Sequence, residues 1–340
     1  MAAGEASGDL HGARLLAELS RRMPEVEAFG LGGDEMREAG LELVAHSAEI
    51  SVVGITEVLK VLPRARQVFG ELLAEVDRRR PEAAVLIDFP DFNLRLAEEL
   101  SARGIKVLYY VSPQVWAWRK GRIKGIAKVV DHMLVLFPFE VGFYEEAGVS
   151  VTHVGHPLVD EVPELPQAWD HGPPADEPYQ VALLPGSRPS EVERLLPVML
   201  ETVRRLAEDL PVQANLVRAP TVPREMLEEP VALAGLPVRI VEGPHRVRFE
   251  AIAGSHVALC ASGTATLEVG LLGTPMVVLY RLGSWTYLLA RMLVRLPRVS
   301  LVNLVLDRDA VPELIQSEAE PERIAREVEA LLASPERIAA

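Results

Sequence analysis

Residues 83–93 read AAVLIDFPDFN, an apolar run that passes directly into two carboxylates. A short run rich in branched side chains, followed by helical periodicity, predicts a strand buried on both faces of a parallel sheet. Pro90 has no amide N–H for a strand ladder and fixes its own φ, so the strand should end before it. Asp88 is therefore expected at the carboxyl end of a buried strand, where open α/β sheets bind ligands.

The two carboxylates of this stretch each allow a structural and a chemical interpretation. Aspartate is a leading N-cap residue, and Asp91 directly precedes a helix expected over residues 92–103, so the cap is the favoured interpretation for Asp91. For Asp88 the chemical interpretation is favoured, because an acid at that strand end faces the ligand crevice rather than solvent.

The composition is that of a soluble globular protein with room for two domains. The 340 residues are 49% hydrophobic and 25% charged. The single cysteine, Cys260, excludes an internal disulfide framework, fits a reducing compartment and is interpreted as a small buried hydrophobe. A net charge of −14 argues against general nucleic-acid binding.

Several functional classes lack their signals in this sequence. No uncharged run reaches the roughly 18 residues that span a bilayer, and no signal-peptide pattern opens the chain, so the expected location is the cytoplasm. There is no H-E-x-x-H or C-x-x-C motif, and the D-x-x-D spacing of Asp88 and Asp91 is not a convincing metal site. No metal or other cofactor is predicted.

Other turns in the first half follow the same strand-to-loop pattern. Residues 4–9, GEASGD, form a small-residue loop that opens a helix, a ready site for an anion or sugar hydroxyls. Almost nothing precedes this loop, so we expect its strand to be missing or the loop to be poorly anchored. In residues 109–119, YYVSPQVWAWR, two tryptophans in a polar loop suit carbohydrate or acyl-chain contacts, or close a small core.

The domain division is predicted from proline content. Residues 163–178 hold five prolines and many polar residues, which is typical of a linker. We therefore expect an N-terminal lobe over residues 1–162 and a C-terminal lobe over residues 179–340. Strand and helix patterns alternate again after the linker, which predicts an α/β protein of two Rossmann-like lobes with parallel sheets and a cleft between them.

Two turns in the second half have the chemistry of phosphate sites. Residues 183–193, LLPGSRPSEVE, place Arg188 at a strand end, where its planar fork suits a diphosphate; the alternative is a surface arginine. Ser190 and Glu193 match a capping box. Residues 258–268, ALCASGTATLE, bring a Ser-Gly-Thr turn to a helix start, where N–H groups and hydroxyls can face phosphate. Glu268, one turn on, can reach sugar hydroxyls or remain a solvated helical glutamate.

Two amphipathic stretches, residues 50–66 and 281–298, combine apolar stripes with Lys and Arg. Such stripes suit an interfacial membrane contact, and for the first stretch an ordinary core helix is the favoured alternative from the residues alone. The residues expected at a membrane are Val53, Val58, Leu59, Leu62, Trp285, Leu289, Arg291, Met292 and Arg295.

Five motifs together resemble the lipid-A-disaccharide synthase family in order and spacing, over nearly the whole chain. They are GEASGD (4–9), IDFPDFN (87–93), YVSPQVWAWR (110–119), LPGSR (184–188) and SGTATLE (262–268). The resemblance implies a two-lobed GT-B glycosyltransferase that works by inversion and without metal. The implied donor is UDP-2,3-diacylglucosamine and the acceptor 2,3-diacylglucosamine 1-phosphate, giving UDP and a β-1,6-linked tetraacyl disaccharide 1-phosphate.

The resemblance also implies roles for individual residues. Asp88 is the expected general base. Donor binding is expected from Ser187, Arg188, Ser262, Gly263, Thr264, Thr266, Glu268, Asn303 and Gln316. Acceptor binding or other polar site roles are expected from Glu5, Ser7, Asp9, Asp91, Ser112, Gln114 and Trp116. The implied partners are the two lipid sugars and the cytoplasmic face of the inner membrane, with no nucleic acid and with a homodimer left open.

The sequence departs from the family at both ends. The strand before residue 4 is nearly absent, and the chain stops soon after a helix ending near Leu332, where the family's final helices pack back on the N-terminal lobe.

Two other functions compete with this one. A UDP-N-acetylglucosamine 2-epimerase or another two-lobed sugar transferase would share the nucleotide lobe without needing a membrane surface. A non-catalytic sugar-nucleotide-binding scaffold would be favoured by loss of Asp88 or Arg188, and both are present.

Overall fold

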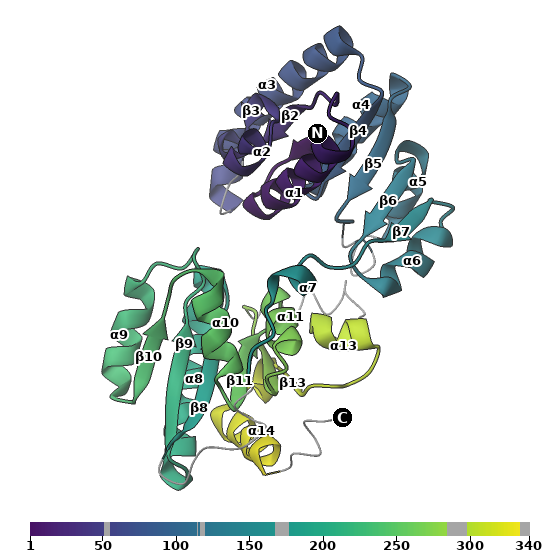
Figure 1. Ribbon diagram of the computed structural model, residues 1–340. Coiled ribbons are helices and arrows are strands. Elements are labelled where there is room, and N and C mark those ends of the chain that lie inside the picture. The colour runs from purple at the N-terminus through teal and green to yellow at the C-terminus, as the bar shows by residue number, and fades with distance from the viewer. Residues whose placement is uncertain (51–54, 114, 116–119, 167–176, 284–297, 334–340) are drawn as a thin grey trace. The chain divides into compact units, whose positions relative to one another are not determined.

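A computed structural model describes residues 1–50, 55–113, 115, 120–166, 177–283 and 298–333 (Figure 1). The chain forms two compact units, Met1–Pro157 and Leu158–Ala340. The division falls before the expected linker at residues 163–178, because the short helix α7 (Leu158–Glu161) already packs on helix α11 of the second unit. Residues 167–176 of that segment lie outside the described part of the chain.

The first unit is built on a seven-stranded parallel sheet of order β3-β2-β1-β4-β5-β6-β7. The strands are β1 (Ala2–Ala3), β2 (Phe29–Gly32), β3 (Glu42–His46), β4 (Ala83–Ile87), β5 (Lys106–Tyr110), β6 (His132–Val135) and β7 (Val151–His153). The strand expected to be missing is present as β1. Its Ala2 pairs with Leu31 on one side and Leu86 on the other, so two buried residues occupy a central position.

Helices cover this sheet with the apolar faces that their sequence periodicity predicts. They are α1 (Ala6–Arg22), α2 (Asp34–Glu38), α3 (Ile55–Arg79), α4 (Pro90–Ala102), α5 (Ile123–Val129) and α6 (Pro138–Glu145). In α3, Val68, Leu72 and Val76 repeat every four residues and are buried in the unit's core. Helix α4 begins at Pro90 with Phe89 as N-cap, so the expectation that Asp91 caps this helix is wrong.

The second unit has a six-stranded parallel sheet of order β10-β9-β8-β11-β12-β13. Its strands are β8 (Tyr179–Leu184), β9 (Val212–Val217), β10 (Val238–Val241), β11 (Val257–Ala261), β12 (Met276–Tyr280) and β13 (Glu313–Ile315). Besides α7, its helices are α8 (Pro189–Asp209), α9 (Glu225–Ala234), α10 (His245–Ala253), α11 (Thr264–Leu271), α13 (Leu301–Leu306) and α14 (Pro321–Leu332).

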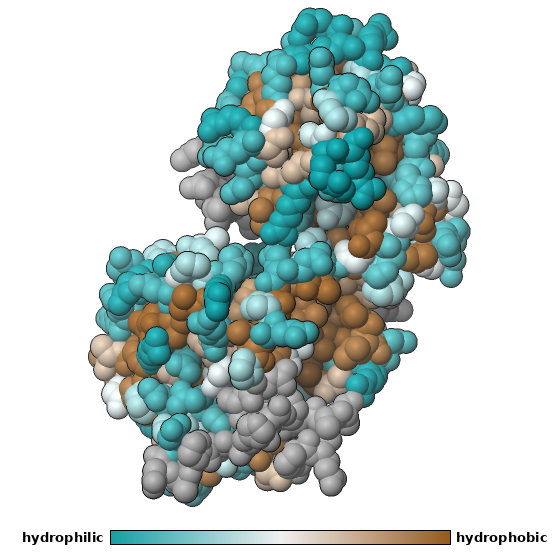
Figure 2. All heavy atoms as spheres, in the orientation of Figure 1, coloured by the Kyte–Doolittle hydropathy of each residue, from teal (hydrophilic) through white to brown (hydrophobic). Residues whose placement is uncertain are grey.

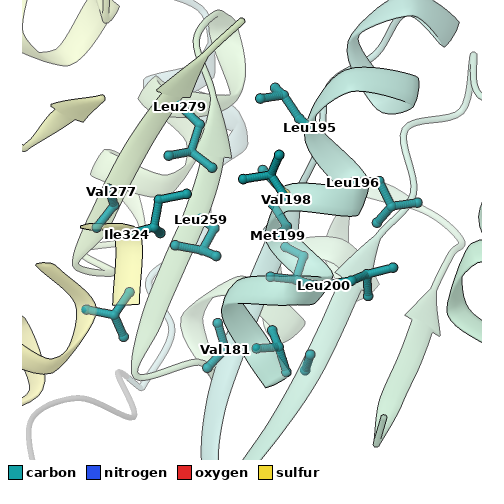
Figure 3. Close-up of a cluster of buried hydrophobic side chains, with 14 of the residues drawn as sticks. Val181, Leu195, Leu196, Val198, Met199, Leu200, Leu259, Val277, Leu279 and Ile324 are labelled. Atoms are coloured by element: carbon teal, nitrogen blue, oxygen red, sulfur yellow. The ribbon is translucent and has the colours of Figure 1, made fainter. Parts of the chain in front are cut away.

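Helix α14 packs inside the second unit. Its Ile324 lies in one cluster with Leu195 and Met199 of α8 and with Leu259 and Val277 of the sheet (Figure 3). Full burial of each such side chain contributes about 1.5–3 kcal/mol to folding. The apolar face of α14 is therefore used in this core, and packing of the final helices on the N-terminal lobe stays a prediction.

Both sheets have the strand order of a doubly wound nucleotide-binding fold. The chain reverses direction across the sheet between β1 and β4 in the first unit and between β8 and β11 in the second. The predicted fold class, two Rossmann-like lobes with parallel sheets, is confirmed. Open α/β sheets bind ligands at the carboxyl ends of their strands at such reversal points, which directs attention to the residues after these four strands.

Candidate active site

Asp88 lies at the reversal point of the first sheet, directly after β4. Its backbone is left-handed, with φ of 46°, and Phe89 follows with φ of 50°. The carboxyl group is half-buried, and this burial raises its pKa from 3.8 to about 6. The negative charge of Glu5 adds to the rise, while the amide N–H of Phe89 donates to the carboxylate and opposes it.

A carboxyl group with a pKa of about 6 is suited to accept a proton near neutral pH. It is mostly ionised at pH 7–8, yet it is a far stronger base than an ordinary aspartate. The structure therefore places at the reversal point a group that can deprotonate a hydroxyl. The general-base role itself stays a prediction.

The loop that opens α1 lies beside Asp88 because β1 and β4 are neighbours. Glu5 and Ser7 are exposed at the start of this helix. Gly4 is required there, since a Cβ atom at this position would lie 2.2 Å from the ring of Phe89. The structure thus brings Glu5, Ser7 and Asp88 to one edge of the first sheet.

The charge of Glu5 provides a test of what sets the pKa of Asp88. Replacing Glu5 by Gln removes a negative charge, so the pKa of Asp88 should fall and the acidic limb of the pH–rate profile should move to lower pH. Glu18→Gln on the same helix is the matched control, because Glu18 is paired with Arg21 and Arg22. An acidic limb that does not move in Glu5→Gln would mean that this charge does not act on the titrating group.

Asp9 has a structural position at the start of α2. Its carboxylate is buried and accepts the amide N–H groups of Gly33 (2.6 Å), Glu35 (3.1 Å) and Met36 (3.2 Å). It therefore caps α2, whose first N–H groups have no partner within the helix. The amide groups that bind this carboxylate come from a segment 24 or more residues away, and a role of Asp9 in acceptor binding stays a prediction.

Two of the other expected acceptor-side residues have partners within the first unit. Asp91 is exposed and pairs with Arg122, Nη2 to Oδ1, at 2.9 Å. Ser112 is buried, and its hydroxyl donates to the carboxylate of Glu140, so it points inward rather than toward a ligand. Gln114 and Trp116 lie outside the described residues.

Arg188 lies after β8 at the reversal point of the second sheet. It is the N-cap residue of α8, its side chain is 75% exposed, and Nη1 donates to Glu191 Oε1 at 2.8 Å. Glu191 Oε2 also accepts the amide N–H groups of Ser187 (3.0 Å) and Arg188 (3.2 Å). The capping glutamate is therefore Glu191, and the predicted Ser190–Glu193 box is wrong because α8 begins at Pro189.

The Arg188–Glu191 pair leaves the guanidinium available to a ligand. Exposed ion pairs contribute little to stability, about 0–1 kcal/mol. A diphosphate offers the same fork a stronger, bidentate partner. Ser187 is exposed beside it.

The turn after β11 offers backbone donors more than side-chain hydroxyls. Gly263, with φ of 150°, is the N-cap of α11, and Thr264 is exposed at the helix start. The hydroxyl of Ser262 donates to Val299 O at 2.8 Å, and that of Thr266 donates to Gly263 O at 2.8 Å. These two hydroxyls stabilise the turn, and a phosphate contact from them stays a prediction. Gly263 and Thr264 are the better candidates for phosphate contact, because the first N–H groups of α11 follow them.

Glu268 belongs to a charged cluster that sequence reasoning did not find. Burial raises its pKa, while Arg248 and His245 on α10 lower it and Glu161 on α7 raises it again. Arg248 is buried, and its Nη2 lies 3.4 Å from His245 Nδ1. An arginine in a helix is usually solvated, so nothing in the sequence pattern distinguishes Arg248 from its exposed neighbours.

Arg248 should hold Glu268 in its ionised form. Arg248→Met is expected to raise the pKa of Glu268 further and, if Glu268 binds donor hydroxyls, to raise the donor KM about tenfold at pH 7, which corresponds to about 1.4 kcal/mol. Arg246→Met, on the same helix but exposed and paired with Glu250, is the control. An unchanged donor KM in a folded Arg248→Met protein would separate Arg248 from the site.

Asn303 and Gln316 form hydrogen bonds with other groups of the protein near the end of the second sheet. Asn303 is fully buried, its Nδ2 donates to Val311 O and Glu313 Oε1, and its Oδ1 accepts from Val311 N. These bonds occupy the amide of Asn303 inside the unit, and its contact with the donor stays a prediction. Gln316, with φ of 55°, bonds both backbone groups of Leu282 (3.2 and 3.4 Å) and follows β13 directly; a donor contact for Gln316 stays a prediction.

Few of the residues expected at a membrane can be placed. Leu62 in α3 is exposed. The backbone of Val58 and Leu59 belongs to the same helix, and Val53, Trp285, Leu289, Arg291, Met292 and Arg295 lie outside the described residues. Figure 2 shows apolar side chains gathered on the second unit over α11 and α13, where Leu271 and Leu306 are about half exposed. Within the described part of the chain, no helix has both the length and the apolar character needed to cross a bilayer.

Comparison with known proteins assigns the family. A family model described as lipid-A-disaccharide synthetase matches residues 1–339. The chain belongs to the lipid-A-disaccharide synthetase family. The lipid-A-disaccharide synthase of Anaeromyxobacter dehalogenans (strain 2CP-1) is 51% identical over 97% of this chain and 86% of its own length. That of Myxococcus xanthus (strain DK1622) is 46% identical over 96% of this chain and 85% of its own length.

Solved structures of other proteins share the fold of this family member. The MurG protein of Acinetobacter baumannii superposes with a TM-score of 0.58 and 14% identity, covering 97% of this chain and 89% of its own. The UDP-GlcNAc 2-epimerase of Neisseria meningitidis, bound to UDP-GlcNAc, gives a TM-score of 0.59 and 10% identity, covering 98% and 90%. At such low identity these likenesses show the two-lobed GT-B architecture alone. The synthetase family match does not favour the 2-epimerase alternative.

Proposed function

We propose that this protein joins UDP-2,3-diacylglucosamine to 2,3-diacylglucosamine 1-phosphate by an inverting sugar transfer. The acceptor hydroxyl forms a bond to the anomeric carbon of the donor sugar, the bond from that carbon to the diphosphate breaks, and UDP leaves. The product is the β-1,6-linked tetraacyl disaccharide 1-phosphate of lipid A biosynthesis. Family membership supports this reaction, and the observation that carries its mechanism is Asp88, a half-buried acid at a reversal point.

On the acceptor side, Asp88 takes the proton of the attacking hydroxyl. A hydroxyl is a weak nucleophile, and removing its proton during attack is the task of a general base. A pKa of about 6 leaves Asp88 ionised at the pH of the cytoplasm while keeping its basicity high. Glu5 and Ser7 lie at the same sheet edge and are the nearest candidates to bind acceptor hydroxyls.

On the donor side, the second unit binds the nucleotide diphosphate through fixed positive charge. Arg188 supplies a bidentate fork, and the first amide N–H groups of α11, after Gly263, supply donors at the positive end of a helix dipole. Both stabilise the negative charge that develops on the departing UDP. Glu268, whose ionised form is favoured by the charge of Arg248, lies one turn further and accepts from sugar hydroxyls.

Product analysis distinguishes this function from its competitor. The protein is supplied with both lipid sugars in mixed micelles, and separately with UDP-N-acetylglucosamine alone. We expect disaccharide and UDP from the first mixture by mass spectrometry and no epimerised sugar nucleotide from the second. Epimerisation without disaccharide would replace the proposal by the 2-epimerase function.

We further propose a peripheral contact with the cytoplasmic face of the inner membrane, where both lipid substrates are embedded. The support is the exposed Leu62 on α3 and the exposed Leu271 and Leu306 on α11 and α13 (Figure 2). Apolar side chains at a bilayer surface gain roughly 25 cal/mol per Å² that they bury. A homodimer stays a prediction of the family resemblance.

Replacing Leu62 and Leu306 together by Ser should therefore weaken binding to vesicles of inner-membrane phospholipids, measured by flotation. Leu233→Ser is the control. Leu233 is an exposed leucine (80%) on α9, and α9 packs on β10, the edge strand of the second sheet that lies farthest from β13. Equal flotation of the parent and the double variant would remove these side chains from the membrane contact.

A further inference from the structure

The backbone at Asp88 adopts a conformation that its side chain disfavours. Asp88 and Phe89 are consecutive residues with positive φ, 46° and 50°, and neither is glycine. A Cβ atom is crowded against the carbonyl oxygen in this region, so such residues persist only where their surroundings enforce the conformation. The question is which contacts enforce it at the candidate general base.

Two buried side chains clamp the Asp88 carbonyl group. Asn93 Nδ2 donates to Asp88 O at 2.8 Å, and the hydroxyl of Tyr109 donates to the same oxygen at 2.7 Å. Both side chains are fully buried, so solvent does not compete for these bonds. The amide N–H of Asp88 is also held, donating to Tyr110 O at 2.9 Å.

Asn93 connects this clamp to the neighbouring strands. Its Nδ2 also lies 3.1 Å from Ala2 O of β1 and 3.1 Å from Ile87 O of β4. Because three carbonyl oxygens surround Nδ2, a flipped amide would set Oδ1 against all three, so the orientation is fixed. In this orientation Asn93 Oδ1 is buried and has no hydrogen-bond partner among the described residues, an unfavourable arrangement that the fold nevertheless retains.

The clamp determines the direction of the Asp88 side chain. With the N–H held by Tyr110 and the carbonyl held by Asn93 and Tyr109, neither φ nor ψ of Asp88 is free to turn. The bond from Cα to Cβ then has one direction relative to the sheet. The next residue, Phe89, is restrained as well, because its ring packs against Gly4 where a Cβ atom of that residue would lie.

We propose that Asn93 and Tyr109 are positioning residues that hold Asp88 in its left-handed conformation and so aim its carboxylate at the acceptor hydroxyl. The proposal rests on the proposed function of Asp88 as general base. Neither side chain needs to touch a substrate, since both act through the Asp88 carbonyl oxygen. Pre-organised placement of a reacting group is worth large factors in rate, and small displacements lose them.

Tyr109→Phe is the mildest test, because it removes one hydroxyl and keeps the ring in the core. We expect kcat to fall about tenfold, with the donor KM and the affinity for UDP unchanged. Asn93→Asp keeps the shape but cannot donate to the three carbonyl oxygens when ionised, and its kcat should fall further. Thr202→Val is the control, since Thr202 is a buried hydroxyl in the second unit that donates to Val198 O at 2.9 Å.

The Asp88 carboxyl group is also observed directly, by NMR titration of its labelled carbon in the parent and in Tyr109→Phe. A released side chain would reach solvent, so its pKa should fall from about 6 toward 3.8. An unchanged kcat together with an unchanged titration would overturn the proposal, as would an equal loss of kcat in Thr202→Val. Absence of disaccharide from the parent, with the titration shifted in Tyr109→Phe, would instead contradict the proposed function and leave the positioning role supported.

Discussion

Replacing Asp88 by Asn is expected to lower kcat for disaccharide formation by about 10²–10⁴, the usual contribution of a general base. The amide has nearly the same shape but cannot accept the proton of the attacking hydroxyl. The donor binds through the second unit, so its KM should change little. Steady-state kinetics with both lipid sugars measures this, and a variant with parental kcat would exclude Asp88 as the base.

The same substitution should make the protein more stable at pH 8. The folded-state pKa of about 6 lies above the ordinary 3.8, so the folded protein binds this proton more tightly than the unfolded chain. Ionising Asp88 therefore lowers the free energy of unfolding as pH rises from about 4 through 6, and the total decrease is about 3 kcal/mol. Asp88→Asn removes that cost above pH 6 and gains nothing near pH 4.

Denaturant unfolding of the parent and Asp88→Asn at pH 8 and pH 4 measures this difference. Asp91→Asn is the control for stability, because Asp91 is 80% exposed and its pair with Arg122 is a surface ion pair of small energy. A variant less stable than the parent at pH 8 would mean that burial does not disfavour the ionised form of Asp88. A functional acid that destabilises its own fold is an expected trade-off.

Replacing Arg188 by Met is expected to raise the donor KM and the dissociation constant of UDP by about 10–150-fold. Charge-assisted hydrogen bonds contribute about 1.5–3 kcal/mol each, and the variant loses the bidentate fork to the diphosphate. Arg188→Lys should recover part of this, because it keeps the charge but not the fork. Stability should hardly change, since the pair with Glu191 is exposed.

Titration with UDP by calorimetry gives the affinities directly. Arg194→Met is the matched control in the same helix, because Arg194 is exposed and its Nη1 donates to Ser190 O. An Arg188→Met protein that binds UDP as tightly as the parent would show that the diphosphate is held elsewhere.

The fold and the strand-end residues could be predicted because short-range sequence patterns carry them. The apolar run before Asp88 and the turn after it required no knowledge of distant residues, and the same holds for Arg188. The two-residue strand β1 was not predictable. Its place comes from pairing with Leu31 and Leu86 rather than from its own length.

The sequence does not show which polar residues have hydrogen-bond partners that are distant along the chain. The Asp9 carboxylate accepts hydrogen bonds from amide groups from Gly33 onward, and the side-chain amide of Asn303 hydrogen-bonds to Val311 and Glu313. Nothing local distinguishes such a carboxylate or amide from one that faces a ligand. The same reason hides Arg248, whose burial depends on the packing of α10 against α11.

The most direct test of the account is the pH dependence of disaccharide formation from the two lipid sugars in the presence of EDTA. We predict UDP and the β-1,6 disaccharide, with kcat/KM falling below an apparent pKa near 6 as Asp88 becomes protonated. No product, or a rate that stays level from pH 8 to pH 5, would contradict it.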